Sequence, residues 1–131
     1  MPVLMRLNRK KKAMTKQEIY EAVMALDIRQ GEYGWIITQD KLAEDLELDD
    51  NETGTYGPRG CSKKLHDALL SGKGHKFKMY DGDNELYYKG LFIGDPTSED
   101  GFGPLDDFGM PNAGCVRIDY YDAKLKRYVT L

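Results

Sequence analysis

FGPLDDFGMPNAG, residues Phe102–Gly114, is the stretch around which the rest of the chain is organised. It holds three glycines and two prolines, a composition that fits neither the hydrophobic periodicity of a helix nor that of a strand. Four large apolar residues are nevertheless interspersed in it: Phe102, Leu105, Phe108 and Met110. A loop this rich in apolar side chains is predicted to fold back onto the core as an Ω-like element, with Leu105 and Phe108 buried.

Strand-like runs lie on both sides of this loop. Upstream, Lys76–Tyr80 alternates polar and apolar residues, and Glu85–Ile93 returns after a turn of Asp, Gly and Asn residues that favours a hairpin. Downstream, Cys115–Tyr121 and Arg127–Leu131 predict a second hairpin. We therefore expect an antiparallel sheet of about four strands between residues 75 and 131.

Three helices are predicted before the sheet. Thr15–Ile28 opens with a Thr-x-x-Glu capping box and places its apolar residues on one face. Thr38 would cap a second helix, Gln39–Leu48, and Ser62 would cap a third, Lys63–Ser71. The expected fold class is α+β, with three N-terminal helices packed on a roughly four-stranded antiparallel sheet.

Length and charge divide the chain into an arm and one domain. Residues 1–13 contain RLNRKKK and are predicted to form a flexible basic arm, whereas residues 14–131 are predicted to form a single α+β domain. The two cysteines are far apart and outside any CxxC pattern, which predicts free thiols in a reducing compartment. No signal-peptide core or membrane-spanning run is recognisable, so a cytoplasmic location is expected.

The charge is unevenly distributed. The net charge is −3, yet residues 1–17 carry six cations and no acid, while Asp81–Gly109 carries eight acids and only Lys89 as a base. An acidic segment of this kind repels nucleic-acid phosphate and favours a basic surface on another protein. Nucleic acid is expected to bind only weakly, through the arm. The predicted partner-binding residues are Asp95, Glu99, Asp100, Phe102, Asp106 and Asp107.

A winged-helix DNA-binding regulator is the first alternative. TQDKLAEDLEL, residues 38–48, is similar to a support helix, and the helix after Ser62 would then read DNA through Arg59, Lys63 and Lys64. Two features oppose this reading. The two helices are joined by a long linker instead of a tight turn, and Lys76–Tyr88, which would form the wing, has an acidic tip.

A small hydrolase centred on Asp106 and Asp107 is the second alternative. Adjacent carboxylates are candidates for acid and base or for metal ligands, although turn capping explains them as well. The only histidines, His66 and His75, form no recognisable nucleophile and base pattern with other residues. The sequence therefore favours a non-enzyme, and it predicts no cofactor and no metal.

Two segments carry a resemblance to a known group of proteins. FKMYDGDNELYYKG (Phe77–Gly90) and GFGPLDDFGMPNAGC (Gly101–Cys115) contain a YDxDxELYYxG hairpin and a PLDDFGxPNAG loop, with GPRG upstream at Gly57–Gly60. In these motifs the chain resembles small bacterial and phage-type proteins, over about residues 56–120. The resemblance supplies no activity or catalytic residue, but it implies a mobile-element origin. Together with the charge, it favours a non-enzymatic protein-binding module, a phage-type inhibitor or modulator of a host defence protein.

Overall fold

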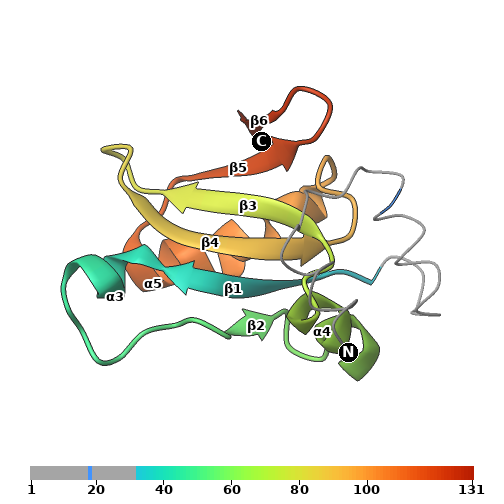
Figure 1. Ribbon diagram of the computed structural model, residues 1–131, viewed down its shortest axis with the longest axis horizontal. Coiled ribbons are helices and arrows are strands. Elements are labelled where there is room, and N and C mark those ends of the chain that lie inside the picture. Colours follow the sequence, from blue (N-terminus) through green and yellow to red (C-terminus); the bar gives the residue numbers. More distant parts are fainter. Residues whose placement is uncertain (1–17, 19–31) are drawn as a thin grey trace, which may run out of the picture.

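The computed structural model describes Glu18 and residues 32–131. Its centre is a six-stranded antiparallel sheet with the strand order β2-β1-β4-β3-β5-β6 (Figure 1). The strands are β1 (Gly34–Asp40), β2 (Tyr56–Gly57), β3 (His75–Tyr80), β4 (Leu86–Ile93), β5 (Arg117–Asp122) and β6 (Arg127–Thr130). The arm predicted at residues 1–13 lies outside the described residues, and so does the helix predicted over Thr15–Ile28, apart from Glu18.

The expected arrangement of three N-terminal helices on a roughly four-stranded sheet is wrong. The described part of the chain is mostly sheet, and its helical segments are short. These segments are α3 (Lys41–Asp45), α4 (Lys63–Leu70), the 3-10 turn η1 (Glu99–Phe102), the π-helical turn η2 (Leu105–Gly109) and α5 (Met110–Ala113). In this part of the chain, no helix is long and apolar enough to cross a bilayer.

Strand β1 accounts for much of the difference. It continues through Gln39 and Asp40, which pair with Lys89 and Tyr88 of β4, so the predicted helix Gln39–Leu48 shrinks to α3. The predicted cap, Thr38, is replaced by Asp40, whose Oδ1 accepts a hydrogen bond from the Ala43 amide at 3.0 Å. Pairing with β4 outweighs the helical pattern of these residues because it satisfies their backbone groups in the ladder.

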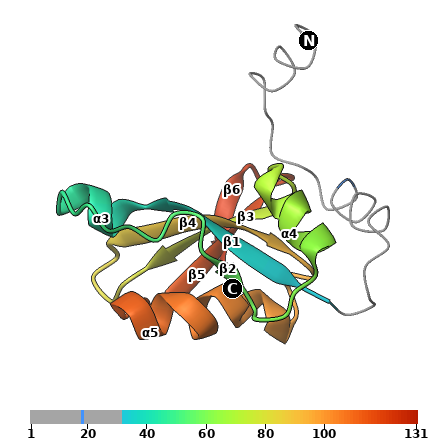
Figure 2. The ribbon, with the colours of Figure 1, turned by 90° about the horizontal axis from the view of Figure 1, so that it is seen from below.

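The two faces of the sheet are covered differently. Residues 99–113 lie against one face, below the sheet in Figure 2, where Phe77, Phe92 and Phe108 belong to one buried cluster. On the other face, α4 packs Leu65 and Leu69 into a smaller cluster with residues of β1 and β4. Ser62 caps α4 as predicted, and its Oγ accepts from the Leu65 amide at 3.2 Å.

The predicted burial of the organising loop is confirmed, but its conformation is not. Leu105 is 5% exposed and Phe108 is 4% exposed, so the segment is anchored on the core. Its backbone is helical from η1 to α5 and ends at Gly114, which has the left-handed φ of 71°. Its other glycines serve close packing, since a Cβ at Gly109 would lie 2.6 Å from the Met79 sulfur.

Both predicted hairpins are confirmed. Strands β3 and β4 pair in an antiparallel register, as do β5 and β6. Cys61 and Cys115 are free thiols as expected, although only Cys115 is fully buried.

Candidate functional site

Three acidic side chains gather beside Tyr33, just before β1. Burial raises the pKa of the Tyr33 hydroxyl, and the negative charges of Asp107, Asp100 and Asp106 raise it further. The ring lies against the turn that carries these acids, because a Cβ at Gly103 would stand 2.9 Å from Tyr33 Cε2. The fold therefore brings together an aromatic residue and carboxylates that are remote in sequence.

Exposed groups flank this cluster. Phe102, at the end of η1, is 37% exposed, although most aromatic rings of this size are buried. Glu99, Asp106 and Asp107 are exposed, and Asp100 is half-buried. We call this surface the acidic edge and define it as Tyr33, Glu99, Asp100, Phe102, Asp106 and Asp107.

The sixth predicted binding residue, Asp95, has a local structural role that sequence reasoning missed. Its Oδ1 accepts hydrogen bonds from the Thr97 amide at 2.9 Å and the Thr97 hydroxyl at 2.6 Å. Its backbone carbonyl accepts from the Ser98 hydroxyl, and Ser98 in turn caps η1. Asp95 therefore fixes the turn that leads into the acidic edge, and we leave it out of the edge itself.

The cations of the DNA-binding alternative lie elsewhere. Arg59, Lys63 and Lys64 are exposed around the start of α4, and Lys63 Nζ pairs with Asp67 Oδ2 at 2.9 Å. Helices α3 and α4 lie at opposite ends of β1 in both ribbon views (Figures 1 and 2), with β2 between them in the chain. These two helices therefore do not form a helix-turn-helix pair.

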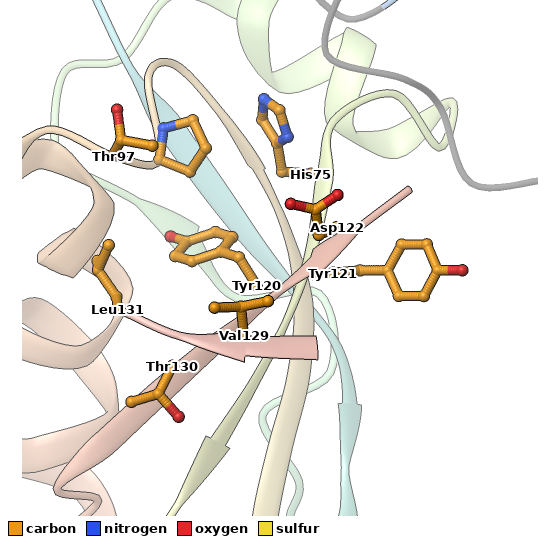
Figure 3. Close-up of a pocket in the computed structure, with 9 residues that line it drawn as sticks. His75, Thr97, Tyr120, Tyr121, Asp122, Val129, Thr130 and Leu131 are labelled. Carbon is orange, nitrogen blue, oxygen red and sulfur yellow. The ribbon is translucent and has the colours of Figure 1, made fainter. Parts of the chain in front are cut away.

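A pocket of about 210 Å³ opens at one end of the sheet (Figure 3). Its lining is mainly apolar and includes Tyr120, Val129 and Leu131, and His75 and Asp122 also line it. The hydrolase pair Asp106 and Asp107 does not line it. Among the described residues, no group of three or more His, Cys, Asp or Glu side chains is placed to hold a metal ion.

A basic and aromatic surface on the sheet escaped prediction. Strand β3 has the sequence HKFKMY, in which Phe77 and Met79 face the core while Lys76, Lys78 and Tyr80 face the other way. The alternation was visible in the sequence. However, the surface also needs lysine, arginine and tyrosine residues of β4, β5 and β6, and only the strand order and register bring them together.

Comparison of the chain with protein-family models, curated proteins and solved structures finds no match. The resemblance carried by the hairpin and loop motifs therefore stays a prediction. The function has to be argued from the geometry.

Proposed function

We propose that the protein is a small non-enzymatic binding module that engages a basic surface of another protein through the acidic edge. The observation that carries this proposal is the packing of the acidic segment on Tyr33 at Gly103, where the charges of Asp100, Asp106 and Asp107 act on the tyrosine hydroxyl, together with the exposed ring of Phe102. Clustered charge speeds the encounter with an oppositely charged partner, and an exposed aromatic ring beside it supplies contact area.

The edge is held in a fixed shape, which favours binding. Leu105 and Phe108 anchor the segment beneath the sheet. The Tyr120 hydroxyl donates a buried hydrogen bond of 2.7 Å to the carbonyl of Gly101, between Asp100 and Phe102. A surface that is ordered before the encounter loses less conformational entropy on binding.

The class of partner follows from charge and from the sequence motifs. A basic protein surface complements the edge, and the phage-type resemblance favours a host protein, the target of an inhibitor or modulator, as the partner. Cys61 and Cys115 are both free thiols, and this supports the cytoplasm as the place of action.

The acidic edge predicts a specific change in the titration of Tyr33. In Asp100→Asn/Asp106→Asn/Asp107→Asn, the pKa of Tyr33 should fall, because carboxylates disfavour the tyrosinate. It should stay above the ordinary value, because burial, the largest cause, remains. Carbon NMR of ring-labelled tyrosine, with Tyr33→Phe for assignment, measures the change. An unchanged pKa would show that the carboxylates do not face this ring.

The same triple variant tests the function. We expect a partner purified from the source cells with the wild-type protein to associate about tenfold more slowly with the variant, and with a weaker dependence on salt. The matched control is Glu47→Gln/Asp49→Asn/Asp50→Asn, which removes the same charge from exposed residues remote in sequence from the edge. Stopped-flow or surface-binding kinetics give the rates.

Both triple variants should melt close to the wild type, because exposed substitutions typically cost less than about 0.5 kcal/mol and the half-buried Asp100 is replaced by an amide of the same size. Equal slowing in the two variants would mean that only net charge matters. Wild-type rates in the acidic-edge variant would refute the proposal.

A further inference from the structure

The sheet has a second surface, mostly of half-buried side chains, on the side away from residues 99–113. There α4 covers one end of β1 and β4, and no other described helix lies over β3, β5 and β6 (Figures 1 and 2). We call this surface the open face. Its side chains alternate with core residues along each strand, and they are Lys76, Lys78, Tyr80, Lys89, Arg117, Asp119, Tyr121, Tyr128 and Thr130.

The open face concentrates positive charge on an acidic protein. Lys78 and Lys89 are directly opposite each other in the β3–β4 register, an arrangement of like charges that destabilises a sheet. The carboxylate next in the row, Asp119, already accepts from Arg117 Nε at 3.1 Å and from the Thr130 hydroxyl at 2.8 Å. Four cations against this one carboxylate leave +3 on the face, whereas the whole chain has −3.

Aromatic rings are interleaved with these cations. The Arg117 guanidinium lies 4.1 Å from the centre of the Tyr80 ring, and Lys78 Nζ lies 4.2 Å from that of Tyr128. Tyr121 contacts Tyr128 edge to face at 5.3 Å. Figure 3 shows the Tyr121 ring pointing away from Tyr120, hence to the open side of β5. Planar groups and cations thus alternate across three strands.

We propose that the open face binds single-stranded nucleic acid. Phosphates would lie against the lysines, while bases stack on the Tyr121 ring and on the outer face of the Arg117 guanidinium. A broad sheet face of several strands does not enter a duplex groove, which admits a helix or a two-stranded ribbon. The carboxylates of the acidic edge belong to the segment on the opposite side of the sheet, so they do not crowd the phosphates.

Binding of a fluorescent oligothymidylate of about 12 nucleotides to the full chain tests this inference. In Lys76→Gln/Lys78→Gln/Lys89→Gln, we expect at least about tenfold weaker binding. The slope of log affinity against log salt concentration (the salt slope) should become smaller in magnitude by about 2, because each lost phosphate contact contributes roughly 0.7. Arg117 is kept, because it pairs with the buried carboxylate of Asp119. Removing the opposed lysines relieves repulsion, so the variant should fold.

The matched control is Arg59→Gln/Lys63→Gln/Lys64→Gln, which removes three exposed cations near α4. It should bind like the wild type. Equal losses in both variants would assign binding to net charge, and a loss in the control alone would assign it to the helix. Either result overturns the inference, as does the absence of binding by the wild-type protein.

Two further probes separate bases from simple charge. Tyr121→Leu should weaken oligothymidylate binding severalfold without changing the salt slope. An abasic strand of equal length should bind the wild-type protein as weakly as oligothymidylate binds Tyr121→Leu. If polyglutamate at equal charge competes as well as the oligonucleotide, or if the abasic strand binds equally well, the face recognises an acidic polymer and the inference is wrong.

Discussion

Replacement of Phe108 by alanine is expected to lower the free energy of unfolding by about 3 to 5 kcal/mol. Its ring is almost fully buried, with ring centres 4.9 Å from Tyr88 and 5.5 Å from Trp35. Truncation would leave a cavity between η2 and the sheet that rigid neighbouring strands cannot fill. Urea unfolding followed by circular dichroism measures the change, provided that the m-value stays constant.

Phe102→Ala is the control, because the same residue type in the same segment is partly exposed. It should cost much less than Phe108→Ala, since little apolar area leaves the core. Similar small costs for both variants would show that residues 99–113 lie outside the cooperative unit. The acidic edge would then lack the rigid support on which its proposed function depends.

The sequence predicted those elements whose signals are local. The β3–β4 and β5–β6 hairpins were predictable because alternation and turn residues occur within a few positions of each other. Strand β2 has only two residues, Tyr56 and Gly57, and it exists because they pair with Ile36 and Trp35. No local pattern marks so short a strand. Likewise, Gln39 and Asp40 have helical neighbours in sequence but strand partners in space.

The acidic edge was predicted only in part, for a related reason. Asp100, Asp106, Asp107 and Phe102 belong to one acidic segment and could be proposed from composition. Tyr33 could not, because it reaches them only through the packing of the residue before β1 against Gly103. The charge of a segment is visible in the sequence, whereas the residue against which it packs, here Tyr33, is set by the tertiary fold.

Gly90 carries the second large prediction. It pairs with Ile37 on one side and Phe77 on the other, directly beside a register shift in β1 between Ile37 and Gln39. A Cβ at this position would lie 2.3 Å from the Ile36 carbonyl oxygen and 2.3 Å from Phe77 Cζ. Because backbone lies on one side and a buried ring on the other, neither neighbour can move cheaply. Gly90→Val should therefore destabilise the protein by about 3 kcal/mol or more, at or beyond the upper range for overpacked cores.

Two companions make this prediction specific. Gly82→Ala, at the tip of the β3–β4 hairpin, adds a Cβ with no atom within 4 Å and should leave stability nearly unchanged. Phe77→Leu in the Gly90→Ala background should recover part of the loss, because a smaller side chain makes room for the new methyl group. The double variant should then be more stable than the sum of the two single costs predicts, by roughly 0.5 to 3 kcal/mol. Strict additivity in urea unfolding would show that the Phe77 contact is not the cause. A harmless Gly90→Val would show that β4 does not pass this closely between β1 and β3.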